Sequence, residues 1–308
     1  ERISPNAVTF RCILRACGSI GALENGKRIH EDIVSKGLLD KNTLLGTSLV
    51  DMYAKCGALA KSKEVLEALP VRDTMTWNAL IAGYVQGEQA DEALECLVQM
   101  QEEGVSPDGI TFTCILKACG NTGNLSEGKK IHEEIVSRGF LEKDIMLGTA
   151  LVDMYAKCGM LVKAQEVLEE LPNRDVVAWS ALIAGYVQVG RGHEALCCFE
   201  KMQRENITPN EITFTCILKA CGSTRSLDTG KAIHDEVKKK GLLGKDVMLG
   251  NALMFMYVKC GRLGNAFEVF DELPYRDAVS WNTILSGYAE RGKVEEALRC
   301  FHNMQYEG

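Results

Sequence analysis

Cysteine is the residue type best placed to do chemistry in this 308-residue chain, because thirteen cysteines could bind metals or form disulfides. The segment LVDMYAKCG occurs twice and LMFMYVKCG once, and each copy starts 102 residues after the one before. The cysteine near the end of each copy therefore occupies the same position of a repeat. Three further positions also hold a cysteine in every copy, and Cys197 alone is out of register. The cysteines in register are Cys56, Cys158 and Cys260; Cys12, Cys114 and Cys216; Cys17, Cys119 and Cys221; and Cys96, Cys198 and Cys300.

The spacing of these cysteines argues against a metal or redox site. Pairs such as Cys12 and Cys17 lie about 140° apart around a helix, so their sulfurs cannot both face one ion. The chain contains no CxxC, and disulfide scaffolds belong mainly to short secreted domains. Free cysteine is often a buried core residue. The pattern therefore predicts small buried thiols at contacts between repeats, and no metal.

The histidines give no stronger indication of catalysis than the cysteines do. His30, His132 and His234 share one position of the repeat, so they mark a helix position more than a ligand set. The letters HEE at His132 match the H-x-E of zinc nucleotide deaminases, but that signature also requires P-C-x-x-C. No proline precedes a cysteine in this chain, and no Gly-rich phosphate loop follows a predicted strand. The sequence therefore predicts no enzyme and no cofactor.

Composition and charge place the chain in a broad class. Apolar residues make up 46% and charged residues 25%, which is enough apolar material for a continuous core. No run approaches the roughly 18 apolar residues of a membrane span, so no membrane partner is predicted. The first ten residues show neither a secretory signal nor a Ser/Arg-rich leader. The formal charge of -7 would disfavour nucleic acid only if net charge mattered more than its distribution.

Three shorter segments, of 36, 31 and 35 residues, nest inside each 102-residue period. The 36-residue segments begin with sequences such as ITFTCILKACG, which occurs word for word twice, and the 31-residue segments carry the YAKCG stretch. The 35-residue segments begin MTWNALIAGY, VAWSALIAGY and VSWNTILSGY. The predicted segments are 1–7, 8–43, 44–74, 75–109, 110–145, 146–176, 177–211, 212–247, 248–278 and 279–308.

Each segment reads as a pair of helices. Trp77, Leu80, Ile81 and Tyr84 fall at i, i+3, i+4 and i+7, which is one stripe of an amphipathic helix. A single helical hairpin cannot bury such a stripe, so neighbouring hairpins must stack. The sequence therefore predicts an all-α solenoid of helix-turn-helix repeats. We also expect helices to end in a left-handed residue at six repeated glycines, which are Gly18, Gly57, Gly120, Gly159, Gly222 and Gly261.

The segment VSWNTILSGYAERGKVEEALRCFHNMQYEG resembles a pentatricopeptide repeat, and the three segment lengths resemble the L, S and P motifs of the plant PLS subclass. On this resemblance 8–43, 110–145 and 212–247 are L motifs; 44–74, 146–176 and 248–278 are S motifs; 75–109 and 177–211 are P motifs. Residues 1–7 are the tail of a preceding P motif, and 279–308 is an incomplete one. The resemblance implies one continuous right-handed superhelix that binds single-stranded RNA in chloroplasts or mitochondria, one base per repeat, to direct C-to-U RNA editing.

In this family two polar residues per repeat read one base: the fourth residue, and the residue two places before the next repeat. A short hydroxyl leaves room for a purine and Asn suits a pyrimidine, while a carboxylate only accepts hydrogen bonds and an amide can also donate. Five pairs then read G, U, G, A and U, which predicts 5'-GUNGANU-3' running parallel to the chain. These pairs are Thr47/Asp73, Asn78/Asp108, Thr149/Asp175, Ser180/Asn210 and Asn251/Asp277.

The L motifs fit this code less well. Thr113/Asp144 and Thr215/Asp246 nominally read G, but L motifs are poor readers in the family, and Arg11/Asn42 departs from the pattern. Asn282 is the fourth residue of the incomplete last repeat. Helix capping, which also favours Ser, Thr, Asn and Asp, is the alternative explanation for these pairs. Capping does not require the fourth residue, already inside the helix, to be polar.

Two further sets of residues complete the predicted RNA site. The first residue of every repeat is apolar, and in this family it packs against base faces, although a core residue would be apolar too. The clamp residues are Val8, Leu44, Met75, Ile110, Met146, Val177, Ile212, Met248 and Val279. Lys55, Lys157 and Lys259 match the family position that faces the RNA backbone. The first helices are rich in Lys and Arg, with only Asp51, Asp153 and Glu290 as acids, which predicts a positive groove.

Two other partners enter as alternatives. The letters WNALIAGY place Trp and Tyr as in tetratricopeptide repeats, which bind proteins, but Ile81 stands where that family has Gly and no uniform 34-residue period exists. The resemblance also implies that L motifs dock multiple organellar RNA editing factors (MORF/RIP proteins). Apolar residues near the L hairpin ends could serve this docking or could pack between repeats. These residues are Leu38, Leu39, Phe140, Leu141, Leu242 and Leu243.

Overall fold

The computed structural model describes residues 5–39, 42–141, 144–243 and 246–307, and these form eighteen α-helices and no strand. Residues 1–4 of the predicted N-terminal tail lie outside the described part. The helices are α1 (Ala7–Ile20), α2 (Leu23–Ser35), α3 (Thr43–Lys55), α4 (Leu59–Ala68), α5 (Thr74–Gln86), α6 (Ala90–Glu102), α7 (Gly109–Thr122), α8 (Leu125–Ser137), α9 (Ile145–Lys157), α10 (Leu161–Glu170), α11 (Val176–Gln188), α12 (Gly192–Arg204), α13 (Glu211–Thr224), α14 (Leu227–Lys239), α15 (Val247–Lys259), α16 (Leu263–Glu272), α17 (Ala278–Ala289) and α18 (Val294–Glu307).

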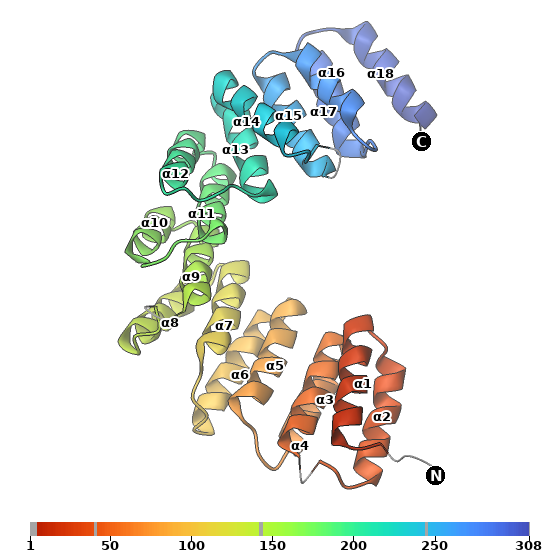
Figure 1. Ribbon diagram of the computed structural model, residues 1–308, viewed down its shortest axis with the longest axis vertical. Helices are drawn as coiled ribbons and strands as arrows, with labels where there is room; N and C mark the ends of the chain where they lie inside the picture. The colour runs from red at the N-terminus through yellow and green to blue at the C-terminus, as the bar shows by residue number, and fades with distance from the viewer. Residues whose placement is uncertain (1–4, 40–41, 142–143, 244–245, 308) are drawn as a thin grey trace. The chain divides into compact units, whose positions relative to one another are not determined.

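The helices belong to two compact units, Glu1–Cys158 with α1 to α9 and Gly159–Gly308 with α10 to α18. Within each unit the odd-numbered helices pack side by side in a row, and each even-numbered helix packs against its odd-numbered neighbours (Figure 1). Each unit is thus a stack of helical hairpins. The predicted all-α helical-repeat solenoid is confirmed, while the right-handed superhelix and the repeat boundaries stay predictions. None of the helices in the described ranges combines the length and the hydrophobicity needed to cross a membrane.

Helix α5 shows how the sequence pattern builds one of these helices. Asp73 is its N-cap, and its carboxylate accepts the backbone N–H of Thr76 at 2.9 Å. The predicted stripe is the buried face, because Trp77, Leu80 and Ile81 are at most 2% exposed. Burying side chains of this size stabilises a fold by about 1.5 to 3 kcal/mol each.

The prediction for the repeated glycines is half right. Gly57, Gly159 and Gly261 follow α3, α9 and α15 and adopt φ of 74°, 74° and 78°, the left-handed conformation expected there. Gly18, Gly120 and Gly222 instead lie inside α1, α7 and α13, and their helices continue to Gly21, Gly123 and Arg225, which take the left-handed conformation. The reason is packing between helices: a Cβ on Gly120 would lie 3.3 Å from the Cα of Met154.

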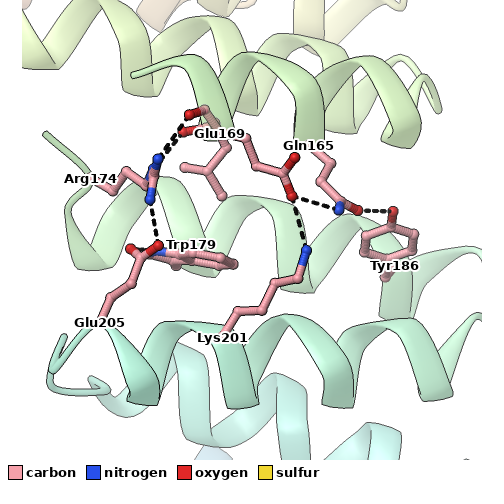
Figure 2. Close-up of polar contacts among 8 residues, drawn as sticks. Gln165, Glu169, Arg174, Trp179, Tyr186, Lys201 and Glu205 are labelled. Carbon is pink, nitrogen blue, oxygen red and sulfur yellow. Dashed lines mark hydrogen bonds and ion pairs between the residues drawn. The ribbon is translucent and has the colours of Figure 1, made fainter. Parts of the chain in front are cut away.

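Side-chain hydrogen bonds join the hairpins where α10, α11 and α12 meet (Figure 2). Arg174, in the loop before α11, donates to the backbone carbonyls of Leu168 and Glu169 and to the carboxylate of Glu205. The indole N–H of Trp179 donates to that same carboxylate at 3.3 Å. These bonds fix the loop between two predicted repeats to the helices on both sides.

The histidines in register bond tyrosines on the next helix. The distances from Nδ1 to the tyrosine hydroxyl are 3.0 Å for His30 and Tyr53, 2.9 Å for His132 and Tyr155, and 2.7 Å for His234 and Tyr257. Burial lowers the pKa of His30 and His234, so both are held neutral. These side chains therefore connect α2 to α3, α8 to α9 and α14 to α15.

The prediction of buried thiols for the cysteines in register is right for six of them and wrong for Cys12. Cys17, Cys96, Cys119, Cys198, Cys221 and Cys300 are buried, whereas Cys12 is exposed, as is Cys197, which is out of register. Cys56, Cys158 and Cys260 are half-buried, and each lies with its thiol 3.7 or 3.8 Å from a backbone carbonyl of the neighbouring odd-numbered helix. Within the described part of the chain, no three His, Cys, Asp or Glu side chains gather to hold a metal.

Candidate nucleic-acid interface

The first residue of each predicted repeat is exposed, although it is apolar. A core residue would be buried at this position, so exposure separates the two explanations that the sequence left open. The least exposed of the nine is Leu44 at 42% and the most exposed is Met248 at 67%. The others are Val8, Met75, Ile110, Met146, Val177, Ile212 and Val279, all between 54% and 66% exposed. Each unit therefore presents a series of apolar side chains to solvent, one at the start of each odd-numbered helix.

The fourth residue of a repeat lies beside the N-cap of the next odd-numbered helix. Asn78 on α5 donates from Nδ2 to Oδ1 of Asp108 at 3.0 Å, and its Oδ1 accepts from the Thr111 hydroxyl at 2.6 Å. The backbone N–H of Thr111 also donates to Asp108. Burial works against the negative charge, but the hydrogen bonds from Thr111 and Asn78 hold the pKa of Asp108 below its usual value. Asp108 is therefore an ionised acceptor at neutral pH.

The same Asn–Asp arrangement recurs in unit 2, and a variant of it built from hydroxyls occurs in both units. Asn251 on α15 donates to Oδ1 of Asp277 at 3.1 Å and accepts from the Ser280 hydroxyl at 2.7 Å. Two other fourth residues, Thr47 and Ser180, carry a hydroxyl that hydrogen-bonds the hydroxyl of the residue three places after the N-cap. The partners are Thr76, 2.8 Å from Thr47, and Thr213, 2.6 Å from Ser180. The two residues of each of these four predicted pairs are thus held close together.

In every predicted pair the second residue is also a helix N-cap. The explanation by helix capping is therefore correct for all of these second residues. Each side chain accepts a backbone N–H in the first turn of the helix that follows it. These residues are Asn42, Asp73, Asp108, Asp144, Asp175, Asn210, Asp246 and Asp277. Capping uses one oxygen of each side chain and leaves the polar fourth residue unexplained. The caps therefore fix the orientation of the same groups that would read a base.

The structure pairs the residues of the predicted L motifs less closely. Thr113 donates its hydroxyl to the Gly109 carbonyl at 2.8 Å within its own helix, and Thr215 is buried on α13. Arg11 is exposed on α1, and Asn282 is exposed on α17. Of the remaining pair, Thr149 is 7% exposed on α9 of unit 1 and Asp175 caps α11 of unit 2.

A cavity of about 430 Å³ in unit 2 brings the predicted groups of one repeat together. Met248 and Val279, the first residues of two successive repeats, both line it, and so do Asn251 and Asp277. Apolar side chains from two helices and a bonded Asn–Asp pair are what a flat, polar-edged base requires. The remaining lining residues are Val187, Gly190, Thr215, Lys219, Ser223, Ala252, Phe255 and Thr283.

The lysines predicted to face an RNA backbone are held by acids. Lys55 lies 2.7 Å from Asp51 and Lys157 lies 2.8 Å from Asp153, one helical turn away in each case. Lys259 pairs with Glu290 at the end of α17. The predicted acids of the first helices are wrong at one residue: α13 begins at Glu211, whereas Glu290 is the C-cap that follows α17.

The cations on the first helices of the predicted L motifs form no such pairs in the described part of the chain. Arg15, Lys117 and Lys219 occupy the eighth position of their repeats, and none of them forms an ion pair within the described ranges; Arg11 does not either. Lys117 and Lys219 are exposed on α7 and α13. The positive charge available to an anion therefore lies on the first helices of the predicted L motifs. It does not lie on Lys55, Lys157 and Lys259, which are paired with acids.

The apolar residues at the L hairpin ends are at least partly covered. Leu38, Leu39, Leu141 and Leu242 are half-buried, and Leu243 is 6% exposed. Phe140 packs edge-on against Phe112, with ring centroids 5.9 Å apart. Both of these rings belong to the predicted segment 110–145, so their contact is packing within one hairpin. Packing between repeats and docking of MORF/RIP proteins both stay predictions.

Comparison with protein families identifies the repeats. Two families match, described as "PPR repeat family" over residues 72–140, 174–223 and 276–308, and as "PPR repeat" over residues 149–176, 212–242 and 251–277. Together these matches cover well over half of the chain.

Curated relatives match nearly the whole chain. Pentatricopeptide repeat-containing protein At4g18520, chloroplastic, from Arabidopsis thaliana is 38% identical over 304 residues, which are 99% of this chain and 49% of the relative. The mitochondrial protein At1g06140 from the same plant is 35% identical over 95% of this chain and 52% of its own length. The chain spans about half the length of these relatives.

A solved structure has the same fold. The crystal structure of the pentatricopeptide repeat protein PPR10 in complex with an 18-nt psaJ RNA element matches with a TM-score of 0.81 and 20% identity, covering 99% of this chain and 46% of that one. The crystal structure of the pentatricopeptide repeat protein PPR10 from maize matches with a TM-score of 0.55 and 19% identity, over 99% of this chain and 54% of its own.

Proposed function

The chain belongs to the pentatricopeptide repeat family, and from this premise we propose that it binds single-stranded RNA and reads one base per repeat. The observation that carries the proposal is the cavity lined by Met248, Asn251, Asp277 and Val279. A base in this cavity would lie between two apolar side chains, and its edge would meet the Asn–Asp pair. PPR10, whose fold this chain shares, was solved with an RNA element bound.

The bonded pairs support a preference for particular bases. Asn251 and Asn78 extend further from their helices than Ser180 or Thr47 and leave room for the smaller pyrimidines. Asp277 and Asp108, held ionised, accept the ring N–H of uracil, whereas Asn210 can present an amide donor to the ring nitrogen of adenine. Within unit 1 these pairs favour G then U, and within unit 2 they favour A and, one L repeat later, U.

The proposed target is 5'-GUNGANU-3', with the L positions free. A gel shift that compares this oligomer with a scrambled one of equal composition tests the proposal directly. We expect tighter binding to the predicted order, and a binding constant that falls as salt rises, because phosphate contacts release counterions. Equal affinity for both oligomers would remove the reading of bases, and failure to bind either would remove RNA binding itself.

The wider role proposed is target recognition for C-to-U RNA editing in a plant organelle. The names of the relatives place them in chloroplasts or mitochondria, and the L, S and P lengths are those of the PLS subclass. The chain supplies the RNA address, and an editing activity outside these residues would act on a cytidine near the bound sequence. Sequencing organellar transcripts from plants that lack the whole protein checks this: an unedited cytidine just downstream of a GUNGANU-like site is expected.

A further inference from the structure

The eighth residue of the S-type repeats changes its chemistry in the third copy. Asp51 and Asp153 occupy this position in unit 1, and each pairs with the lysine one turn further along its helix. Phe255 stands at the same position in unit 2. The third copy therefore loses a carboxylate and gains an aromatic ring, and Lys259 pairs with Glu290 on another helix instead.

The Phe255 ring lies in the cavity that holds the candidate base site. It lines that cavity together with Lys219 and Ser223 of α13 and with the Asn251 and Asp277 pair. Gly222 makes room for the ring, since a Cβ there would come within 2.8 Å of the Phe255 Cε1 atom. The ring is half-buried, so part of its face remains open to an occupant.

The charges around Phe255 favour an anionic occupant. Lys219 is exposed, lines the same cavity and forms no ion pair in the described part of the chain. The Lys259 ammonium lies 5.9 Å from the centroid of the Phe255 ring. At the matching place in unit 1, each carboxylate of Asp51 and Asp153 would repel a phosphate and hold its lysine. The cavity in unit 2 thus combines a flat apolar surface with the ammonium of Lys219, while the carboxylate of Asp277 at the same cavity accepts hydrogen bonds from Asn251 and Ser280.

We infer that Phe255 is an additional RNA contact, which stacks on a nucleotide beside the base read by Asn251 and Asp277 while Lys219 meets its phosphate. This inference rests on the proposed binding of single-stranded RNA. Aromatic side chains stack on any base or ribose, so the contact adds affinity without adding sequence preference. It makes the third S repeat a stronger point of attachment than the first two.

Three substitutions at Phe255 separate stacking from packing. Phe255→Ala removes the ring, Phe255→Leu keeps apolar bulk above Gly222, and Phe255→Asp restores the residue of the other two copies. We expect each variant to bind GUNGANU about fivefold or more weakly than the unaltered chain, the lower end for loss of one stacked base. The preference over the scrambled oligomer stays the same. Circular dichroism melting checks that each variant is folded.

The matched gain-of-function variant is Asp153→Phe, which places the ring above Gly120 in unit 1. It is expected to tighten binding by about threefold or more, since it adds a stacking surface and removes a carboxylate. An abasic nucleotide at the sixth position of the oligomer, beside the seventh base that Asn251 and Asp277 would read, identifies the stacked group. If the loss caused by Phe255→Ala disappears with this oligomer, the ring stacks on the sixth base; if it persists, the ring packs on a ribose.

The outcomes distinguish this inference from the proposed function. Unchanged affinity in all three Phe255 variants, with the unaltered chain still preferring GUNGANU, would overturn the inference and leave the proposed function in place. Wild-type affinity in Phe255→Leu with a loss in Phe255→Ala would also overturn it, because the ring would then serve packing alone. Absence of any binding by the unaltered chain would overturn both.

Discussion

The hairpins α5–α6 in unit 1 and α11–α12 in unit 2 occupy equivalent places in the repeat, but their buried tryptophans have different polar surroundings. Trp77 and Trp179 are each 2% exposed. The indole N–H of Trp179 donates to Glu205 at 3.3 Å, whereas that of Trp77 has no hydrogen-bond partner in the described ranges. Both copies have the same Arg and Glu beside the tryptophan, Arg72 and Glu103 in unit 1 and Arg174 and Glu205 in unit 2. The difference therefore lies in the placement of the glutamate carboxylate, which accepts from the indole N–H in unit 2 alone.

A second difference lies nearby. In unit 2, Glu169 accepts from both Gln165 and Lys201 at 2.9 Å, and Gln165 accepts from the Tyr186 hydroxyl (Figure 2). The first copy has Lys63 and Gln99 where the second has Gln165 and Lys201, which exchanges the amide and the cation. The two helices of the hairpin have equivalent bounds in both units, so a shared fold does not require shared polar contacts.

The two buried tryptophans should contribute equally to the free energy of unfolding, and removing either indole tests this. Trp77→Ala and Trp179→Ala should each lower the free energy of unfolding by about 3 to 5 kcal/mol, as for large aromatic side chains in well-packed cores. Urea unfolding followed by circular dichroism measures this loss. A loss under about 1 kcal/mol for one of the two would show that the two hairpins are not packed alike.

The contribution of the indole N–H should differ between the two tryptophans, and replacing each by Phe tests this. Trp179→Phe leaves the Glu205 carboxylate without one donor, so it should cost about 1 to 2 kcal/mol more than Trp77→Phe, which removes a buried donor that has no acceptor. The difference between the two urea midpoints is the measurement, because the change in volume is common to both. Equal costs would contradict the comparison.

The proposed base preference differs between the same two repeats. They end in Asp108 and Asn210, which are both N-caps. Asn210→Asp should shift the preferred base from A towards G by about 1 kcal/mol, at the low end for a contact to a base edge. The reciprocal Asp108→Asn should shift U towards C. Competition gel shifts with single-base variants of GUNGANU measure both; no shift in either would mean that these positions cap helices without reading bases.

The smallest effect concerns the surface charge pair. Lys201 and Glu169 are each about half exposed, so exchanging Lys201 for Gln should cost about 0.5 kcal/mol or less, and less still at high salt. The matched change in unit 1 is Gln99→Lys, which places a cation at the equivalent position. Thermal melts at low and high salt detect the difference, and a cost that is independent of salt would point to packing rather than charge.

The apolar periodicity predicted the fold because it is a property of single helices. The stripe of Trp77, Leu80, Ile81 and Tyr84 is the buried face of α5, as the sequence indicated. The glycines show the limit of this reasoning. Gly120 and Gly57 look alike in sequence, but only the position of α9 reveals that Gly120 is a site of close helix approach.

The candidate site was predictable in its residue types and not in its contacts. The exposure of the first residue depends on the stacking of neighbouring hairpins, which no single helix encodes. The hydroxyl of Thr111 was not singled out from the sequence, although it holds Asn78 and Asp108 together. A hydroxyl residue recurs three places after Asp108 and Asn210, at Thr111 and Thr213, and this recurrence was the available signal.

The unequal burial of the cysteines makes the chain selectively reactive towards thiol reagents. Burial raises the pKa of four thiols to about 12, so these react slowly with alkylating reagents, which attack the thiolate. The slow thiols are Cys96, Cys119, Cys198 and Cys221. Cys12 in unit 1 and Cys197 in unit 2 are exposed. Brief treatment with a maleimide dye should label these two first, placing one fluorophore on each unit and allowing energy transfer between them to follow RNA binding.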